Sequence, residues 1–320
     1  MLNPIPRPIM STVSTSKPYI GRFAPSPTGS LHFGSLVAAV ASYCDAKANG
    51  GNWLVRMEDL DKPREVKGAA DTILQQLEAF GFEWDGEDFD SKILFQSQRS
   101  DLYENALNIL QNKDLIYPCT CTRKEIADSS HAQGIDGLIY PKTCYFNKNT
   151  TPSIHAAYRA VVADKNITFL DAIQGEITQN LARDVGDFIV KRADGLFAYQ
   201  LAVVVDDAAQ AITHIVRGAD LLDSTPRQIY LQQLLGLPTP RYAHLPIASN
   251  AAGEKLSKQT LALPLSTGLV GHQLFEALSF LGQHPPVEIK SNNLGEVWRW
   301  AITHWNMANV PKQRKIIVNS

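Results

Sequence analysis

Residues 19–35 read Tyr-Ile-Gly-Arg-Phe-Ala-Pro-Ser-Pro-Thr-Gly-Ser-Leu-His-Phe-Gly-Ser. A short apolar run leads into a break that contains Pro25, Pro27 and Gly29, and an Ala- and Val-rich segment then extends to Asn49. This order predicts a strand, a tight loop and a helix, an arrangement that binds phosphate groups at the carboxyl end of a parallel strand. His32 precedes the predicted helix, where its imidazole could face phosphate oxygens together with the helix amides. The alternative is a surface turn before a core helix, in which His32 has no ligand.

The thirteen residues from Arg22 to Gly34 resemble the HIGH signature of class I aminoacyl-tRNA synthetases, in its glutamyl and glutaminyl form. The last His of that signature is Ser35 in this chain, which weakens one candidate phosphate contact. The resemblance implies a catalytic role for His32 and an ATP contact for both His32 and Gly34. It also implies that substrate glutamate lies against the start of the loop, at Arg22, Phe23, Ala24, Pro25 and Ser26.

The composition is that of an ordinary globular protein of 320 residues, with 44% hydrophobic and 19% charged residues. The longest apolar run, near residues 36–41, is far too short to cross a bilayer, so we expect no membrane partner and a cytoplasmic location. Residues 1–17 are rich in Pro, Ser and Thr and lack the apolar core of a signal peptide, which predicts a disordered tail. The net charge of −2 gives no overall basic footprint for long nucleic acids, but it does not exclude a local basic face.

The following segments alternate between strands and helices. The apolar run within residues 52–59 predicts a buried strand that ends in charged side chains. An amphipathic helix (64–80), a short strand (94–97) and a second amphipathic helix (99–113) follow. The fold class is therefore α/β, with a doubly wound, Rossmann-like parallel sheet.

Carboxylates at the end of a parallel strand point into the crevice where α/β proteins bind ligands. Glu58 is assigned to such a ligand role, because its segment resembles the one in which the family's Glu contacts the amino group of glutamate. Asp61 is assigned to capping of the next helix.

Three of the four cysteines lie close together in the chain. They are Cys119, Cys121 and Cys144. In a reducing compartment such a cluster indicates a structural Zn²⁺ site, with three plain thiols as the alternative. The residues alone offer His131 or His155 as a fourth ligand. The resemblance instead implies Tyr140, because glutamyl-type enzymes use a Tyr four residues before the last Cys. The fourth cysteine, Cys44, falls inside the apolar first helix and is assigned to core packing.

Residues 150–195 alternate polar and apolar side chains, which predicts a small β-rich insertion, with a hairpin over 184–195 that has an Asp-Gly turn. In the family, such an insertion receives the end of an RNA acceptor.

The apolar run over 196–207 reads as a buried strand or helix. Tyr199 and Arg217, with the residues around them, resemble the family's pair that holds the substrate amino acid. An Arg suits that task because its fork can bind a carboxylate through two nitrogens. A packed Tyr and a surface ion pair are the alternatives.

Two lysines around a Ser on a loop usually mark a solvated surface. The segment Lys255-Leu-Ser257-Lys258 nevertheless resembles the KMSKS loop of the family, with Gln259 in place of the final Ser. The resemblance implies that Lys255, Ser257 and Lys258 bind ATP, and that Lys258 is catalytic because it reaches the phosphates. One or two amphipathic helices follow, over 274–281 and 297–305.

These features divide the chain into five parts. The parts are a disordered tail (1–17), the first half of the nucleotide-binding catalytic domain (18–118), a zinc-bearing insertion (119–195), the second half of the catalytic domain (196–245), and a KMSKS-like loop with a helical C-terminal region (246–320). A full glutamyl-tRNA synthetase continues into an anticodon-binding domain, and the 61 residues after Gln259 are too few for one. The sequence is therefore similar to the truncated branch of the family, the glutamyl-Q tRNA(Asp) synthetases.

That branch activates L-glutamate with Mg²⁺-bound ATP and attaches it to the queuosine base in the anticodon of tRNA(Asp). The implied partners are ATP with Mg²⁺, L-glutamate and tRNA(Asp) that carries queuosine. We expect a monomer that forms glutamyl-AMP without tRNA. The alternatives are acylation of a tRNA acceptor end, a nucleotidyltransferase of the same superfold, and a non-catalytic tRNA-binding module.

Overall fold

The structure is a computed structural model, and it describes residues 18–86, 93–130, 132–147, 155–250, 265–290 and 293–318. The predicted tail, His131 and the KMSKS-like residues 255–259 lie outside these described residues. Strands and helices alternate along the chain around largely parallel sheets, which confirms the α/β class. Among the described helices, none is long and apolar enough to cross a membrane.

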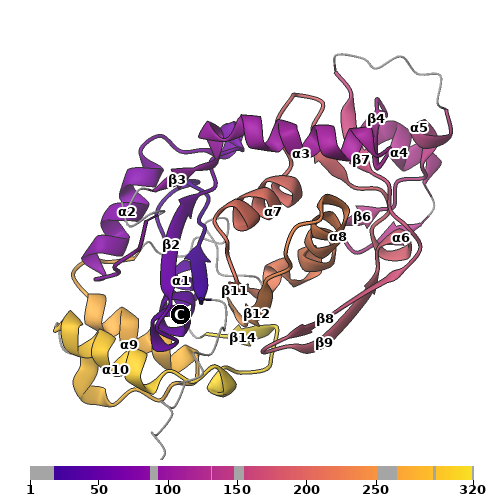
Figure 1. Cartoon of the computed structure of the whole chain (residues 1–320). Coiled ribbons are helices and arrows are strands. Elements are labelled where there is room, and N and C mark those ends of the chain that lie inside the picture. Colours follow the sequence, from indigo (N-terminus) through magenta and orange to yellow (C-terminus); the bar gives the residue numbers. More distant parts are fainter. Residues whose placement is uncertain are drawn as a thin grey trace, which may run out of the picture.

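The first half of the chain forms a three-stranded parallel sheet in the order β1–β2–β3 (Figure 1). Its elements are β1 (Ile20–Phe23), α1 (Phe33–Ala48), β2 (Asn52–Met57), α2 (Ala69–Ala79) and β3 (Leu94–Phe95). Helix α1 is apolar on most of its surface because it packs against β1, β2 and β11 as well as against α9. Cys44 is fully buried in this helix, which confirms its assignment to the core.

The second half of the chain forms a sheet in the order β11–β12–β8–β9. Its strands are β8 (Asn166–Asp171), β9 (Gly175–Asn180), β11 (His214–Gly218) and β12 (Arg241–Leu245). The first three in this spatial order are parallel, and β9 runs antiparallel to β8. The amide of Thr213 donates to the carbonyl oxygen of Ile20 over 2.9 Å, which places β11 beside β1. The strand order therefore reverses between β1 and β11, as in doubly wound folds, and ligands bind outside the carboxyl ends of the strands at such a point.

Two hydrophobic clusters take side chains from opposite faces of β2, with Trp53 and Val55 in the first and Leu54 in the second. The first surrounds α1 and includes side chains of α2, α9 (Val270–Phe280) and α10 (Leu294–His304). The second lies between α3 (Ser100–Asn112), α7 (Tyr199–Ala209) and α8 (Thr225–Leu235). The apolar run over 196–207 is thus a helix from Tyr199 onward. Its continuous apolar stretch is explained by packing between α3, α8 and the sheet.

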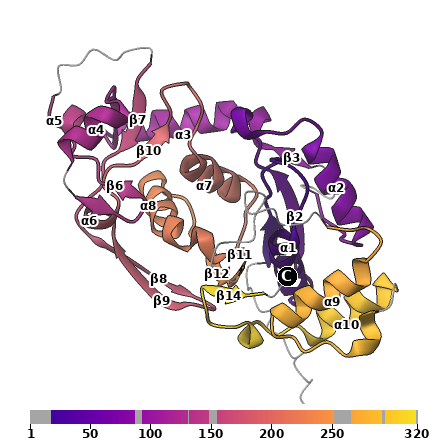
Figure 2. The same cartoon turned by 180° about the vertical axis from the view of Figure 1, so that it is seen from behind.

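The insertion lies at the opposite end of the molecule from α9 and α10, as both views show (Figures 1 and 2). Its sheet has the order β10–β7–β4. The elements are β4 (Ile116–Cys119), α4 (Arg123–Ser129), β5 (Gln133–Gly134), β6 (Gly137–Leu138), α5 (Thr143–Phe146), β7 (Ala157–Ala160), α6 (Leu181–Asp184) and β10 (Ile189–Lys191). The β-rich character was predicted, but β8 pairs with β12, so this part is continuous with the sheet of the second half.

Several predicted boundaries were wrong. The hairpin predicted over 184–195 is present but lies further along the chain: the Asp194-Gly195 turn joins β10 to residues 196–198 through an antiparallel bridge between Lys191 and Phe197, while α6 ends at Asp184. The helix predicted from residue 64 begins at Ala69, because Gly68 adopts a left-handed conformation with φ of 78°. Asp61 instead precedes a short 3₁₀ turn, η1 (Lys62–Arg64), makes no side-chain cap, and accepts a hydrogen bond from Arg64.

The remaining elements complete the fold. They are the parallel pair β13 (Ile247–Ser249) and β14 (Lys315–Ile317), and the 3₁₀ turns η3 (Gln96–Gln98), η4 (Ala219–Ser224), η6 (Val287–Lys290) and η7 (Met307–Asn309). The C-terminal helices α9 and α10 belong to the first core cluster and pack against α1. The indole of Trp298 on α10 donates to the carbonyl oxygen of Phe80 over 3.0 Å and anchors that contact.

Candidate functional site

The loop after β1 leads directly into the amino terminus of α1. It is held from both sides, because the carbonyl oxygens of Pro25 and Pro27 accept bonds from the amides of Glu58 and Val66, each over 3.0 Å. His32 is the N-cap of α1, and its Nδ1 accepts a bond from the amide of Ser35 over 3.4 Å. A neutral imidazole that accepts at Nδ1 carries its proton on Nε2. His32 is thus placed to donate from Nε2 beside the positive end of the helix dipole.

A buried group of charges lies beneath this loop. Arg56 on β2 is fully buried, and its Nη2 donates to Asp207 over 2.8 Å and to Glu58 over 3.1 Å. Arg22 on β1 donates to the same carboxylate of Asp207 over 3.2 Å. Burial raises the pKa of Glu58 in spite of the two arginines, whereas for Asp207 the arginines outweigh burial and lower its pKa. The predicted ligands Arg22 and Glu58 are therefore joined through two residues that the sequence analysis did not single out.

Asp206, the neighbour of Asp207 on α7, is held mainly by other residues, although its Oδ2 also lies 3.9 Å from Nε of Arg56. Its carboxylate accepts from Gln96 over 2.7 Å, from Arg99 over 2.7 Å and from the hydroxyl of Tyr103 over 2.8 Å. These donors lie on η3 and α3 or directly between them. Asp206 and Asp207 together fix α7 against both the sheet and α3, and so fix the position of Tyr199 at the start of α7.

Arg217 on β11 has a different environment from Arg22 and Arg56. Its side chain is buried, yet its hydrogen-bond partners among the described residues are all side chains without a carboxylate. They are His244 Nε2 (3.1 Å), the Tyr199 hydroxyl (3.4 Å), Thr225 Oγ1 (2.8 Å) and Gln228 Oε1 (2.7 Å). A buried guanidinium without a carboxylate partner is costly, and an anionic ligand would relieve that cost.

The structure brings four of the predicted glutamate contacts together, and these are Arg22, Glu58, Tyr199 and Arg217. Burial raises the pKa of Tyr199, which also responds to the charges of Arg217, Glu58 and Arg22, so the hydroxyl lies within electrostatic reach of all three. Phe23 is different, because its ring packs into the core against Trp53, with 6.2 Å between ring centroids. Only the backbone of Phe23 is left to contact a ligand.

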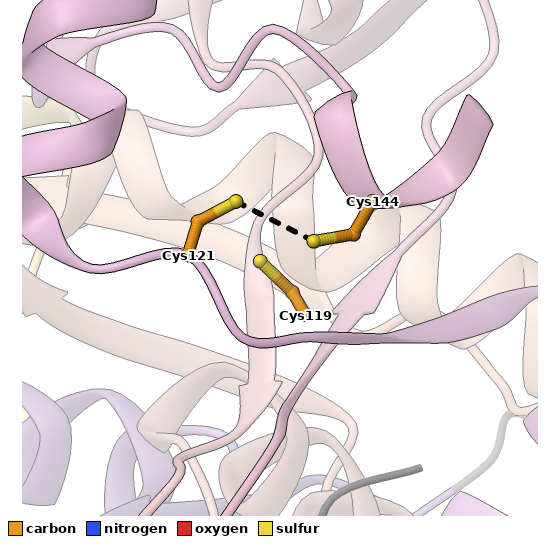
Figure 3. Close-up of side chains that lie close together, drawn as sticks. All are labelled: Cys119, Cys121 and Cys144. Atoms are coloured by element: carbon orange, nitrogen blue, oxygen red, sulfur yellow. Dashed lines mark hydrogen bonds between the residues drawn. The ribbon is translucent and has the colours of Figure 1, made fainter. Parts of the chain in front are cut away.

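The predicted metal ligands also converge (Figure 3). The sulfur atoms of Cys119, Cys121 and Cys144 lie within 4.8 Å of one another, and those of Cys121 and Cys144 are 3.4 Å apart. The hydroxyl of Tyr140 lies 3.4 Å from the sulfur atoms of Cys119 and Cys121. Four ligands around Zn²⁺ with Zn–S bonds of about 2.3 Å would be roughly 3.8 Å apart, so these donors could hold such a metal ion. His155 is not among the clustered side chains of the described residues.

The sequence comparisons agree with this arrangement. The family described as tRNA synthetases class I (E and Q), catalytic domain, matches residues 20–278. The chain is 55% identical over 298 residues to a glutamyl-Q tRNA(Asp) synthetase of Aromatoleum aromaticum, covering 92% of this chain and 91% of that protein. It is 55% identical over 306 residues to that of Dechloromonas aromatica, covering 95% and 99%. The chain belongs to the glutamyl-Q tRNA(Asp) synthetase family of class I synthetases.

A relative in this family from Neisseria meningitidis is 54% identical over 297 residues, covering 92% of this chain and 98% of that protein. Among solved structures, a glutamate tRNA ligase of Elizabethkingia meningosepticum, crystallised with its amino acid, has a TM-score of 0.73 at 24% identity. It is matched over 93% of this chain, which spans 66% of the length of that structure's chain. This likeness confirms the predicted class I catalytic fold.

Sequence reasoning missed five residues that organise the site. They are Arg56, Asp171, Asp206, Asp207 and His244. One signal was available, since adjacent aspartates at the end of an apolar run are difficult to bury without partners. The strand position of Arg56 gave no comparable indication, because its carboxylate partners lie at the end of the strand (Glu58) or about 150 residues away (Asp206 and Asp207).

Proposed function

We propose that this chain activates L-glutamate with ATP and transfers it to the queuosine base in the anticodon of tRNA(Asp). The observation that carries the glutamate assignment is the buried Arg217, whose partners among the described residues supply no negative charge. The curated relatives support the RNA target, since they share more than half of their residues with this chain over nearly their whole length.

Activation needs no covalent nucleophile. One carboxylate oxygen of glutamate attacks the α-phosphorus of ATP, the bond from that phosphorus to the bridging oxygen breaks, and pyrophosphate leaves with the electron pair. Catalysis then consists of holding the reactants in line and stabilising the negative charge of the crowded phosphates. His32, Gly34 and the amides at the start of α1 are placed for this task, and Mg²⁺ accompanies ATP. Lys255, Ser257 and Lys258 are proposed to contact the phosphates from the other side.

Glutamate is held by opposite charges at its two ends. Glu58 is proposed to accept hydrogen bonds from the substrate ammonium group, with Arg22, Ser26 and the backbone of residues 23–25 closing around it. Because one substrate carboxylate must attack ATP near His32, Arg217 is left to bind the other, the γ-carboxylate. Tyr199 would add a hydrogen bond to the same group. In the second step a hydroxyl group of RNA attacks the carbonyl carbon of glutamyl-AMP, and AMP leaves.

The metal site is proposed to be structural Zn²⁺, one per chain, held by Cys119, Cys121, Tyr140 and Cys144. Besides the two sulfur atoms, the hydroxyl of Tyr140 also accepts from the amide of Cys144 over 2.8 Å. The guanidinium of Arg159 lies 3.9 Å from the centre of the Tyr140 ring, and its positive charge favours a negatively charged phenolate ligand. Bound zinc would fasten a loop-rich segment that has little apolar surface of its own.

The test is incubation of the protein with ATP, Mg²⁺, labelled glutamate and total tRNA from cells with and without queuosine. We expect label on tRNA(Asp) only when queuosine is present, and ribonuclease digestion should locate it in the anticodon fragment. We also expect glutamate-dependent pyrophosphate exchange in the absence of any tRNA. Label at the acceptor end would favour a glutamyl-tRNA synthetase, and no dependence of exchange on glutamate would favour another nucleotidyltransferase.

A further inference from the structure

Behind Arg217 lies a buried pair of side chains that makes no contact with the proposed substrates. His244 on β12 and Asp171 at the end of β8 are both almost fully inaccessible, and His244 Nδ1 lies 2.6 Å from Asp171 Oδ2. The other ring nitrogen, Nε2, lies 3.1 Å from Nε of Arg217. The three side chains therefore form a continuous line across three neighbouring strands, β8, β12 and β11.

The hydrogen-bond pattern determines which ring nitrogen of His244 carries the proton. Arg217 Nε is always a donor, so Nε2 of His244 must be the acceptor. The proton of the neutral ring then lies on Nδ1 and is donated to the carboxylate of Asp171. The hydroxyl of Thr225, 3.0 Å from Nε2, is the only other partner of this ring nitrogen among the described residues.

Burial keeps His244 neutral, although charged groups face it from both sides. Burial is the main cause that lowers its pKa, to about 4, and Arg217 lowers it further, while Asp171 and Asp220 oppose the shift. Tyr242 stacks on the ring with 6.0 Å between centroids, and its own pKa is raised to about 12, so it contributes no charge. A protonated His244 would present a second positive charge and a second donor to Arg217.

The contacts of Arg217 also determine how it can meet a ligand. A guanidinium has five N–H donors. One is used by His244, two on Nη2 by Thr225 and Gln228, and one on Nη1 by Tyr199. The fifth donor lies on Nη1, beside the Tyr199 hydroxyl, and within the described part of the chain it has no acceptor. Arg217 therefore presents one nitrogen, with Tyr199, and not the two-pronged fork that the sequence predicted.

We propose that Asp171 and His244 are positioning residues for substrate selectivity: Asp171 fixes the tautomer of His244, and His244 in turn directs Nη1 of Arg217 toward the substrate carboxylate. This inference takes its substrate from the proposed function. Because His244 is a neutral acceptor, it holds Arg217 in place without compensating the positive charge of the guanidinium, as a neighbouring carboxylate would. A carboxylate in place of His244 would compensate Arg217 and weaken its demand for an anionic ligand.

The replacement Asp171→Asn tests the proposal with little change of shape. Oδ1 of Asp171 accepts from the amides of Ile173 (3.0 Å), Gln174 (2.9 Å) and His244 (3.1 Å), and the amide oxygen of Asn can keep these three bonds. The new Nδ2 donates, so it requires Nδ1 of His244 to accept and moves the ring proton to Nε2, against the donor of Arg217. We expect KM for glutamate to rise about 10- to 100-fold in pyrophosphate exchange, with KM for ATP unchanged.

Three further variants separate positioning from packing. His244→Leu removes the acceptor and should raise KM for glutamate at least as much as Asp171→Asn. His244→Gln restores an acceptor that needs no ring tautomer, so it should recover most of the affinity, and adding Asp171→Asn to it should cause little further loss. Asp187→Asn is the matched control, because Asp187 is equally buried but lies in the insertion, bonded to Tyr117. This control should keep the wild-type KM for glutamate.

The tautomer itself can be read by long-range ¹H–¹⁵N NMR, with the His244 signal assigned from its loss in His244→Gln. We expect the proton on Nδ1 in the wild type and on Nε2 in Asp171→Asn. A wild-type proton on Nε2, or an Asp171→Asn variant with normal glutamate KM and a folded spectrum, would overturn the proposal. If Asp171→Asn does not fold, the wild-type tautomer and the His244→Leu and His244→Gln pair decide the matter. Absence of glutamate-dependent exchange in the wild type would refute the proposed function, while the tautomer measurement would still judge the positioning role.

Discussion

Nη1 of Arg217 on β11 lies 3.4 Å from the hydroxyl oxygen of Tyr199, the first residue of α7. The two residues are eighteen positions apart, and each is held from behind by buried polar groups. A carboxylate placed beside this pair could accept from the charged guanidinium and from the neutral hydroxyl at once. We therefore expect this pair to favour glutamate over glutamine.

The first prediction concerns Arg217→Gln. Loss of the buried charge should lower kcat/KM for glutamate in pyrophosphate exchange by at least about 30-fold, which corresponds to about 2 kcal/mol, and should reduce discrimination against glutamine. The measurement is exchange with each amino acid under identical conditions. Arg241→Gln is the control, because Arg241 is exposed at the start of the neighbouring strand β12. Wild-type selectivity in the Arg217 variant would remove this residue from the glutamate site.

A second prediction follows from the raised pKa of Glu58, which burial causes and Arg56 and Arg22 oppose. The substrate ammonium group binds the ionised carboxylate, so protonation of Glu58 competes with glutamate binding. KM for glutamate should therefore rise as pH falls toward the pKa of Glu58 in the free enzyme. Glu58→Gln should have a high KM at every pH and lose this dependence, whereas exposed Glu176→Gln should follow the wild type. An unchanged pH profile in Glu58→Gln would contradict the assignment.

The third prediction separates the metal site from activation chemistry. Cys121→Ser should reduce zinc content, measured by mass spectrometry, and loosen the segment from Cys119 to Cys144. It should impair glutamate transfer to RNA more than pyrophosphate exchange, because the proposed ATP and glutamate ligands lie outside that segment. Cys44→Ala is the control, since Cys44 is buried in α1 and should leave zinc content unchanged. Wild-type protein purified without chelator and free of zinc would refute the metal proposal, and equal loss of both activities would refute a separate role for the insertion.

Arg56 provides a fourth prediction, on stability. Replacement by Met leaves Asp207 and Glu58 buried without their shared partner, and removal of one partner of a buried ion pair costs about 3–5 kcal/mol. Urea unfolding should show a correspondingly lower midpoint. Arg64→Met removes an ion pair with Asp61 whose arginine is 74% exposed, and should cost less than about 1 kcal/mol. Equal effects of the two substitutions would mean that the buried charges do not organise the fold.

The fifth prediction concerns acid stability. The pKa of His244 is lowered from its ordinary value of 6.5 to about 4 by burial, so the unfolded chain binds a proton at a higher pH than the native state does. Its contribution is fully present above about pH 6.5 and is lost as pH falls toward 4, by about 3 kcal/mol in total. The free energy of unfolding should therefore decline over this window, and the decline should be smaller in His244→Gln. An identical decline in both proteins would show that His244 is not the group responsible.

The sequence by itself determined the family, and it predicted which polar residues face a ligand. The proline- and glycine-containing loop from Arg22 to Gly34 specifies a strand, turn and helix through local backbone preferences, and the cysteine spacing brings sulfur donors near one another along the chain. Such signals are local, so they can be read without knowing how distant segments pack. For the same reason Cys44 could be assigned to the core.

Only the tertiary structure decided which residues hold the proposed binding side chains in place. Asp207 meets Arg22 and Arg56 across more than 150 positions, and Asp171 meets His244 across 73, because strand order in the sheet, and not order in the chain, sets these distances. The bonds that Arg217 donates to its neighbours in the fold, among them His244 and Gln228, left it one nitrogen for a ligand in place of the expected two-pronged fork. The number of donors that an arginine has left for a ligand depends on its neighbours in the fold. The residue type alone could therefore suggest a carboxylate ligand for Arg217, but not the geometry of the proposed contact.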